Sequence, residues 1–174
     1  MDDASPPDPL APPDGPRPDH HPATLLFPVV ERDGARRVLL IRKKRGVGSG
    51  LYNGPGGKVE DGEGVREAAI RETREEVRAS PESVEYAGEL DFRFGEAPFT
   101  YVYVYRAAGL AGTPEETPEA DPEWFAVDAV PYGEMWPDDR HWLPHVLAGN
   151  AVAGTFRFDA DGDDLLEWTL YVSE

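Results

Sequence analysis

The chain has 174 residues, with 34 acidic side chains against 17 basic ones and a formal net charge of −17. Its length suits one domain with its own core, and its acidity argues against duplex DNA or RNA as a partner, because phosphate backbones need basic surfaces. The absence of cysteine excludes disulfides and thiol chemistry. No membrane-spanning run and no signal peptide are visible, so we expect a cytoplasmic protein with no membrane partner. Scarce lysine in so acidic a chain suggests adaptation to high salt, which screens self-repulsion.

Residues 1–22 are acidic and proline-rich, with almost no bulky apolar side chain. Such a stretch cannot bury enough surface to offset the entropy of ordering, so we expect a disordered tail. His20 and His21 at its end are of a metal-ligating type, but we expect them to be inert. The folded domain is therefore predicted to span residues 23–174.

The domain is predicted to open with a β-hairpin. Two apolar runs, 24–30 and 37–41, flank the dipeptide Asp33-Gly34. Asp-Gly between two strand-like runs is typical of a two-residue hairpin turn.

A glycine-rich stretch follows at residues 46–57, and the three lysines of the chain, Lys43, Lys44 and Lys58, flank it. In a chain that otherwise uses arginine, cations gathered around glycines indicate a phosphate-binding site. The alternative is that these lysines lie by chance at the basic end of a strand, 42–45.

Residues 65–77 are predicted to form a helix. Glutamates at positions 72, 75 and 76 stand at i, i+3 and i+4, so their carboxylates share one face and repel each other. A hard divalent cation offsets that repulsion, and Mg²⁺ commonly arrives with the phosphates of a substrate. The alternative is a solvated face of an acidic protein. The residues expected to pack on a sheet from the other face are Ile70, Thr73 and Val77.

The second half of the chain is rich in strand-like runs, and their predicted bounds are 84–94, 100–106, 124–127, 155–158 and 165–172. The run 101–105 is bulky on both faces, which suits an interior strand. The last two runs are predicted to pair around an aspartate-rich turn, which lacks the glycine of a calcium-binding loop. With a short helix at 141–148, the pattern indicates an α+β fold, a mixed β-sheet sandwiched between α-helices.

The segment Met135-Trp136-Pro137-Asp138-Asp139 allows two interpretations. One is a helix start, with Asp138 or Asp139 as the N-cap. The other is a base-recognition site, in which Trp136 stacks on a purine and two carboxylates, sharing a proton, bind its edge. The sequence alone leaves both open.

The glycine turn and the helix also carry a longer pattern of fixed spacing. Gly57 is followed after five residues by Glu63, then after seven by Arg71-Glu72, then after two by Glu75-Glu76. This pattern resembles the signature of the Nudix hydrolases, which cleave nucleoside diphosphates linked to another group. The resemblance implies that Arg71 orients Glu63 and Glu72 by ion pairing.

Two positions depart from that signature. Thr73 stands where an aliphatic residue is usual, and Arg78 stands where the family has glycine. That glycine ends the helix in a left-handed conformation. We expect an arginine there to cost about 1 kcal/mol.

Four further segments, 51–58, 112–119, 135–139 and Trp142, are similar to one branch of this family, the hydrolases of oxidised purine nucleoside triphosphates such as 8-oxo-dGTP. The substrate contacts that this resemblance implies are Thr24, Lys43, Asn53, Pro55, Gly56, Gly57, Lys58, Phe92, Trp136, Pro137, Asp138 and Asp139. The implied ligands of Mg²⁺, or of Mn²⁺, are the Gly56 carbonyl, Glu72, Glu75, Glu76 and Glu119. The implied catalytic residues are Glu63, Arg71, Glu72, Glu75 and Glu76. Val47 replaces an aromatic residue of this branch, which is expected to weaken stacking on the base.

The resemblance thus implies a monomeric, Mg²⁺-dependent enzyme that converts an oxidised purine (deoxy)nucleoside triphosphate to the monophosphate and pyrophosphate. The alternative is a Nudix hydrolase of another nucleoside diphosphate derivative, such as a sugar nucleotide or a dinucleoside polyphosphate. An isopentenyl diphosphate isomerase on this fold relies on a cysteine, which the chain lacks. A non-enzymatic nucleotide sensor on this fold usually lacks glutamates of the signature. All of them are present in this chain, which argues against a sensor.

Overall fold

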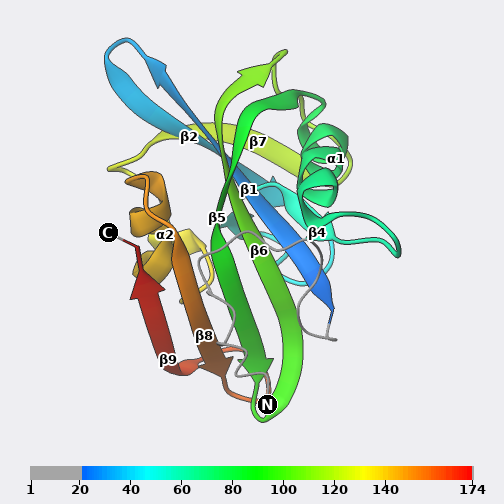
Figure 1. Cartoon of the computed structure of the whole chain (residues 1–174), viewed down its shortest axis with the longest axis vertical. Helices are drawn as coiled ribbons and strands as arrows, with labels where there is room; N and C mark the ends of the chain where they lie inside the picture. Colours follow the sequence, from blue (N-terminus) through cyan, green and yellow to red (C-terminus); the bar gives the residue numbers. More distant parts are fainter. Residues whose placement is uncertain (1–20, 174) are drawn as a thin grey trace, which may run out of the picture.

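A computed structural model describes residues 21–173, in which nine strands form one mixed sheet between two α-helices (Figure 1). The strand order is β3-β2-β1-β6-β5-β8-β9, with β4 paired to β1 and β7 paired to β2. The strands are β1 (Pro22–Arg32), β2 (Ala35–Lys43), β3 (Tyr52–Asn53), β4 (Gly56–Lys58), β5 (Ser80–Phe94), β6 (Ala97–Ala111), β7 (Ala120–Ala126), β8 (Val152–Phe158) and β9 (Leu165–Val172). The helices are α1 (Val65–Val77), α2 (Asp139–Leu147) and a 3₁₀ turn at Tyr132–Glu134. The predicted α+β class is confirmed.

The first two strands form the predicted hairpin. They pair antiparallel from Val29 opposite Val38 to Arg32 opposite Ala35. The turn residues Asp33 and Gly34 have φ of 54° and 77°. Positive φ at both central residues is what a two-residue hairpin turn requires, and Asp-Gly supplies it at low cost.

The interior position predicted for the run 101–105 is also confirmed. Strand β6 lies between β1, to which it is parallel, and β5, to which it is antiparallel. Both β5 and β6 extend beyond their predicted bounds, because their pairing continues out to Ser80 and Ala111. The parallel pairs β1–β6 and β5–β8 join segments far apart in the sequence.

The domain starts slightly earlier than predicted. Strand β1 begins at Pro22, whose carbonyl accepts a hydrogen bond from the Val59 N–H at 3.0 Å. The His21 carbonyl accepts from Thr100 Oγ1 at 2.9 Å. Residues 21 and 22 therefore belong to the fold rather than to the tail, while the rest of the predicted tail, including His20, lies outside the described residues. No helix in the described range 21–173 is long and apolar enough to cross a membrane.

Helix α1 has its predicted bounds and covers one face of the sheet (Figure 1). Leu26 and Tyr103 of the sheet pack there with Val65 and Ala69 of the helix. The predicted contact through Ile70 is wrong, since that side chain is only partly buried. The buried positions of the helix are Val65, Ala68, Ala69, Thr73, Glu76 and Val77.

The two departures from the family signature have clear structural consequences. Thr73 is fully buried, and its hydroxyl donates to the Ala69 carbonyl at 2.8 Å, so its polar group is satisfied within the helix. Arg78 ends α1 with φ 55° and ψ 35°, and its N–H donates to the Arg74 carbonyl. Arginine thus occupies the left-handed position that glycine adopts without strain.

Helix α2 covers the opposite face, to the left of the central strands in Figure 1. Trp142 is fully buried and meets Phe27 edge-to-face, with ring centroids 5.8 Å apart. The helix begins at Asp139, two residues before the predicted start. Its N-terminus, with the Asp138-Asp139 pair, is thereby placed against the sheet.

Candidate active site

The glycine pair Gly56-Gly57 lets strand β4 approach both β1 and α1. A Cβ at Gly56 would lie 1.8 Å from the Thr24 carbonyl oxygen, and a Cβ at Gly57 would lie 2.5 Å from Cδ of Glu72. The backbone contact excludes any side chain at Gly56, whereas a side chain at Gly57 would have to displace the Glu72 carboxylate. The turn therefore presses its backbone against the glutamate face of α1.

Arg71 holds the carboxylates of this region in place. Its guanidinium donates to Glu63 at 2.7 and 2.9 Å, to Glu72 at 2.9 Å and to Glu75 at 3.2 Å. A fifth hydrogen bond, at 3.1 Å, goes to the Lys58 carbonyl. The guanidinium beside Glu63 lowers the pKa of that carboxyl. The expected ion pairs of Arg71 with Glu63 and Glu72 are thus present, and Glu75 joins them.

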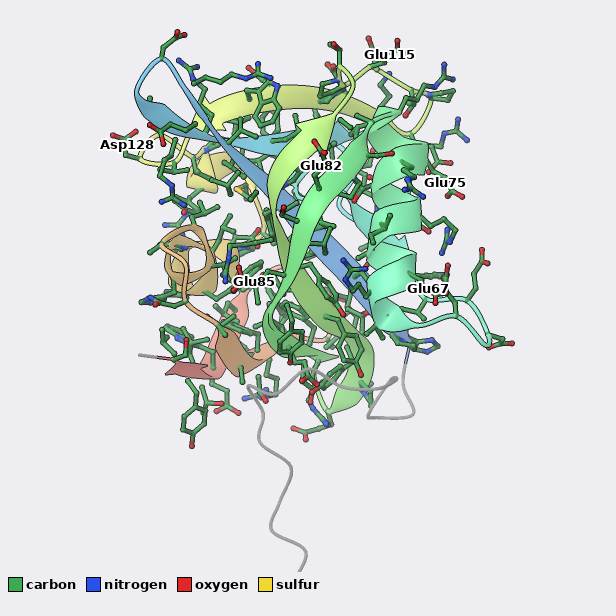
Figure 2. The ribbon with its side chains drawn as sticks, turned by 45° about the horizontal axis from the view of Figure 1, so that its top comes forward. Glu67, Glu75, Glu82, Glu85, Glu115 and Asp128 are labelled. Atoms are coloured by element: carbon green, nitrogen blue, oxygen red, sulfur yellow. The ribbon has the colours of Figure 1, made fainter. Side chains whose placement is uncertain are left out.

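Glu75 differs from the other glutamates of the cluster in its surroundings. Its side chain is 60% exposed and points away from the sheet (Figure 2). Glu72 and Glu76 are more buried. The helix face that carries the three carboxylates is thus solvated at one edge and closed at the other.

Glu76 is the most deeply buried carboxylate of the cluster, and its Oε2 has no hydrogen-bond partner among residues 21–173. Burial raises the pKa of Glu76 to about 8, and the charge of Glu72 adds to this effect. The Gly56 N–H donates to the Glu76 carboxylate and acts in the opposite direction. Burial likewise raises the pKa of Glu72, and the charge of Glu119 acts in the same direction on both groups. The loop before β7 therefore brings Glu119 close to the glutamates of α1.

These residues fit a divalent cation. A buried carboxylate oxygen without a partner is costly unless a cation or donor satisfies it, and hard cations take carboxylate and backbone carbonyl oxygens. Within residues 21–173, no three acidic or imidazole side chains already surround one point as metal ligands. Arg71 instead pairs with Glu72 and Glu75, which supplies the positive charge that the cluster needs.

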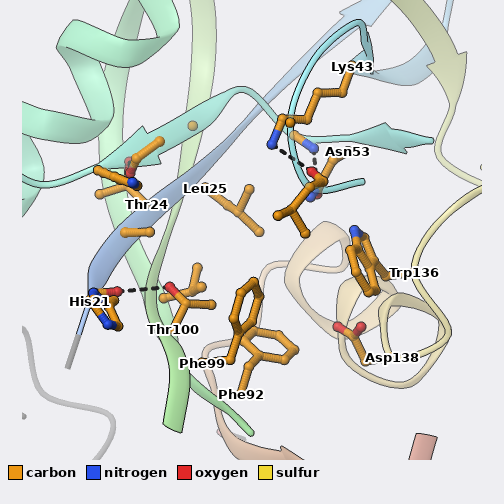
Figure 3. Close-up of a pocket in the computed structure, with 18 of the residues that line it drawn as sticks. His21, Thr24, Leu25, Lys43, Asn53, Phe92, Phe99, Thr100, Trp136 and Asp138 are labelled. Atoms are coloured by element: carbon orange, nitrogen blue, oxygen red, sulfur yellow. Dashed lines mark hydrogen bonds between the residues drawn. The ribbon is translucent and has the colours of Figure 1, made fainter. Parts of the chain in front are cut away.

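A cavity of about 700 Å³ adjoins this cluster (Figure 3). The predicted site residues that line it are Thr24, Lys43, Asn53, Gly56, Gly57, Lys58, Glu76, Phe92, Trp136, Asp138 and Asp139. Pro55 and Pro137 neighbour these residues along the chain without lining the cavity. Because Glu76 lies in its wall, the cavity connects the carboxylates of α1 with the aspartate pair of α2.

The cavity wall includes aromatic and apolar residues that the sequence interpretation missed. They are Leu25, Phe94, Phe99, Val102 and Phe158. A signal for one of them was present, since Phe92 and Phe94 lie two residues apart and share a face of strand β5. Val47 also lines the cavity and is 55% exposed, so this position offers no ring to a ligand.

Trp136 stands on the α2 side of the cavity, across from Phe92 and Phe99 (Figure 3). Its indole rests edge-to-face on Phe158, with ring centroids 5.9 Å apart. The glycine-rich loop closes over it, because a Cβ at Gly48 would lie 2.8 Å from its Nε1. The same loop is tied down by Lys43, whose ammonium donates to the Val47 carbonyl at 2.8 Å.

The aspartate pair does not cap helix α2. Asp138 occupies the N-cap position but makes no side-chain cap hydrogen bond. Both carboxyls are almost fully buried. Asp138 Oδ2 accepts from Trp142 Nε1 at 2.7 Å, and Asp139 Oδ2 has no partner in the part of the chain that the structure describes. This geometry favours the interpretation as a ligand site over the helix cap.

Burial sets the protonation of this pair. It raises the pKa of Asp138 to about 6. It raises the pKa of Asp139 well above the ordinary value, and the neighbouring Asp138 charge adds to the effect. Adjacent buried carboxyls cannot both ionise without cost. The pair therefore offers one hydrogen-bond donor and several acceptors to the cavity.

Comparisons with known proteins agree with this geometry. The NUDIX domain model matches residues 19–146. The chain is 40% identical over 136 residues to the oxidized purine nucleoside triphosphate hydrolase of Mus musculus, covering 78% of this chain and 86% of that protein. It is 40% identical over 131 residues to the protein of the same name from Danio rerio, covering 75% and 83%. The chain therefore belongs to the Nudix hydrolase family.

A solved structure supports the same fold. The MutT protein from Bacillus halodurans superposes with a TM-score of 0.75 at 27% identity, covering 87% of this chain and 97% of that one. The hydrolases of mouse and zebrafish are similar to this chain over most of their length. Among the relatives described, these two guide the assignment of a substrate.

Proposed function

We propose that this Nudix hydrolase converts oxidised purine nucleoside triphosphates, such as 8-oxo-dGTP, to the monophosphate and pyrophosphate. The observation that carries the proposal is the shape of one cavity, with a buried aspartate pair at α2 and the buried Glu76 in its wall. The names of the two 40%-identical relatives support it. Removal of oxidised nucleotides from the precursor pool would be its role in the cell.

The aspartate pair suits the edge of an oxidised purine. Oxidation at C8 converts a ring-nitrogen acceptor of guanine into an N–H donor and adds a carbonyl acceptor. A pair with one carboxyl protonated presents both a donor and acceptors, so it can match a base edge that offers both. Buried polar groups discriminate strongly, because a wrong base leaves them unpaired.

The chemistry would take place at the glutamate cluster. Mg²⁺ there would be held by Glu72, Glu76 and Glu119 with the Gly56 carbonyl and Glu75, and when bound it supplies Lewis-acid polarisation of phosphoryl oxygens and of water. Arg71 keeps Glu63 and Glu72 in fixed orientations. Lys43 lies beside Glu76 in the cavity wall, where its charge can meet a phosphate. One carboxylate of the cluster accepts the proton of the attacking water.

The test is chromatographic identification of the products from a substrate panel, together with phosphate release with and without inorganic pyrophosphatase. The panel holds 8-oxo-dGTP, dGTP, an oxidised adenine nucleotide, a sugar nucleotide and a dinucleoside polyphosphate. We expect 8-oxo-dGTP to be preferred, with phosphate appearing only when pyrophosphatase is added. Preference for the sugar nucleotide or the dinucleoside polyphosphate would overturn the proposal and favour the alternative Nudix substrates.

Variants of the aspartate pair sharpen this test. Asp138→Asn and Asp139→Asn should cut activity on 8-oxo-dGTP and leave Mg²⁺ binding intact, and the losses should differ for the oxidised adenine nucleotide. Asp128→Asn, an exposed aspartate outside the cavity, is the matched control. Parent rates on every nucleotide in both cavity variants would contradict a role in base recognition.

The same proposal includes four further properties of the protein. They are a monomeric state, a cytoplasmic location, tolerance of high salt and independence from duplex nucleic acid.

A further inference from the structure

Two arginines hold the end of helix α2 that lies farthest from the cavity. Arg106 on strand β6 donates to the Val146 carbonyl at 3.1 Å and to the Asn150 carbonyl at 2.7 Å. Arg36, on strand β2, donates to the Leu147 carbonyl at 2.7 Å. The last carbonyls of a helix have no i+4 partner within it, so the bond from Arg36 satisfies the Leu147 carbonyl at the end of α2. Arg106 adds a second donor to the Val146 carbonyl, which also accepts from the Gly149 N–H at 3.1 Å, and binds the Asn150 carbonyl just after the helix.

The crevice around these contacts is a small second cavity, lined on one side by Arg36 and Arg106 and on another by Gly149. Arg106 is a costly residue for this position. Its side chain is only 10% exposed, and within residues 21–173 its one ion pair is with Glu85. The Glu85 side chain is 71% exposed, so this pair contributes little. A buried guanidinium needs good partners to offset its desolvation. Here they are the carbonyls at the negative end of the α2 dipole.

Helix α2 has little internal means of fixing its own position. It spans nine residues, contains Pro144, which removes one backbone hydrogen bond, and has no side-chain cap at its N-terminus. Its length is about 14 Å, so a shift at one end is passed to the other. That other end carries Asp138 and Asp139 in the main cavity.

We propose that Arg106 and Arg36 are positioning residues, which clamp the C-terminal end of α2 and thereby set where Asp138 and Asp139 meet the base. The proposal rests on the proposed function, because it assigns base recognition to that pair. Neither arginine lines the main cavity. The clamp acts at long range, through a rigid helix whose carboxyl end is held to two different strands.

The two arginines reach the end of α2 from different strands. Arg106 reaches the helix end from the interior strand β6, and Arg36 reaches it from the hairpin strand β2. Two anchors on separate strands fix both the height and the tilt of a short helix, which one anchor would not. A displacement of about 1 Å is enough to misplace a hydrogen-bonding group toward its ligand.

The test compares Arg36→Gln, Arg106→Gln and Arg106→Lys with the parent full-length chain in Mg²⁺. We expect Arg106→Gln to raise KM for 8-oxo-dGTP about tenfold, with kcat nearly unchanged. The preference of the enzyme for 8-oxo-dGTP over dGTP should become smaller. Arg36→Gln should show the same effect more weakly. Arg106→Lys keeps a donor at this place and should recover part of the lost preference.

The matched control is Arg157→Gln, which breaks an ion pair with Glu167 between β8 and β9 and no bond to α2. Melting temperatures are measured in parallel. A lower melting temperature with the KM and base preference of the parent would show that the clamp is only structural and would overturn the proposal. Arg36 is exposed, so its variant should fold even if Arg106→Gln does not, and it applies the same criterion.

This outcome is separable from a failure of the proposed function. If the parent does not prefer 8-oxo-dGTP over dGTP, the proposed function fails in the parent itself. The clamp is then judged by KM for whichever nucleotide the parent hydrolyses, because a displaced α2 still changes the wall of the cavity. Unchanged KM in both glutamine variants would reject the clamp in that case also.

Discussion

Gly57 packs directly against the carboxylate of Glu72, so that a Cβ on the glycine would lie 2.6 Å from Oε2 and 2.8 Å from Oε1 of the glutamate. A methyl group at position 57 must push this carboxylate aside. This displacement would also break the hydrogen bond that Arg71 donates to Glu72 at 2.9 Å. The glycine of the turn is therefore part of the glutamate cluster rather than a mere linker.

Gly57→Ala is expected to fold and to lose turnover by about 100-fold, because a carboxylate moved by a methyl group no longer holds its place in the cluster. Turnover on the best nucleotide, together with the melting temperature, checks this. Gly62→Ala is a useful control, since nothing lies within 4 Å of a Cβ there, although its φ of +78° costs some stability. Equal turnover in Gly57→Ala and the parent would show that Glu72 can relax without consequence.

Glu76→Gln should keep the fold and lose turnover by at least about 100-fold. Within residues 21–173 its Oε2 has no partner, and with a pKa of about 8 the acid is mostly protonated below that pH. The amide should therefore leave the melting temperature without Mg²⁺ unchanged there and raise it above about pH 8, where Glu72 repels the charged form. Glu67→Gln, on the outer side of α1 in Figure 2, is the matched control and should behave as the parent. Near-normal turnover in Glu76→Gln would remove Glu76 from the catalytic residues.

The buried aspartate pair should make stability depend on pH. The folded-state pKa of Asp138 is about 6 and that of Asp139 is well above the ordinary 3.8, so both are raised. A carboxyl whose pKa is raised by folding contributes stability that is fully present below its unfolded-state pKa. This stability is lost as pH rises through the folded-state pKa. The parent should therefore lose stability as pH rises above about 4 and through the pKa of about 6 of Asp138, and it should lose more as Asp139 ionises.

Asp139→Asn should flatten this dependence, since it removes one buried acid and the repulsion on Asp138. The difference between its melting temperature and that of the parent should grow as pH rises from about 4 through the pKa of the pair. Thermal unfolding across that range measures the effect, with Asp128→Asn as the exposed control. Parallel curves for Asp139→Asn and the parent would show that the pair does not titrate in this window.

Arg78→Gly should stabilise the protein by about 1 kcal/mol, because residue 78 has φ 55° at the end of α1. The variant loses an ion pair with Glu115 at 3.9 Å, but both side chains are more than 60% exposed, so that loss is small. Urea unfolding gives the difference. Arg78→Ala keeps the left-handed strain and should show no such gain, which separates strain from charge.

A chain that begins at His21 should keep the turnover and melting temperature of the full chain, since the composition of residues 1–20 cannot support a core. A chain that begins at Ala23 should melt lower. It lacks the His21 and Pro22 carbonyls, which accept from Thr100 and Val59. Loss of turnover in the chain that begins at His21 would show that the preceding residues act on the domain.

The sequence by itself determined the elements whose signals are local. Helix 65–77 was predicted with its correct bounds, and its carboxylates at 72, 75 and 76 follow from helical spacing alone. The hairpin turn followed from Asp33-Gly34, since few dipeptides tolerate positive φ at both positions. These features depend on neighbours within a few residues, so they need no knowledge of the rest of the fold.

Only the tertiary structure decided the surroundings of Asp138 and Asp139. As a sequence pattern they fit a helix cap and a ligand site equally well, and what separates the two is burial against strands that lie far away in the chain. The same holds for Arg36 and Arg106, which look like ordinary strand residues until α2 packs its end against them. Long-range packing sets the desolvation and the partners of each polar group, and no short-range pattern carries that information.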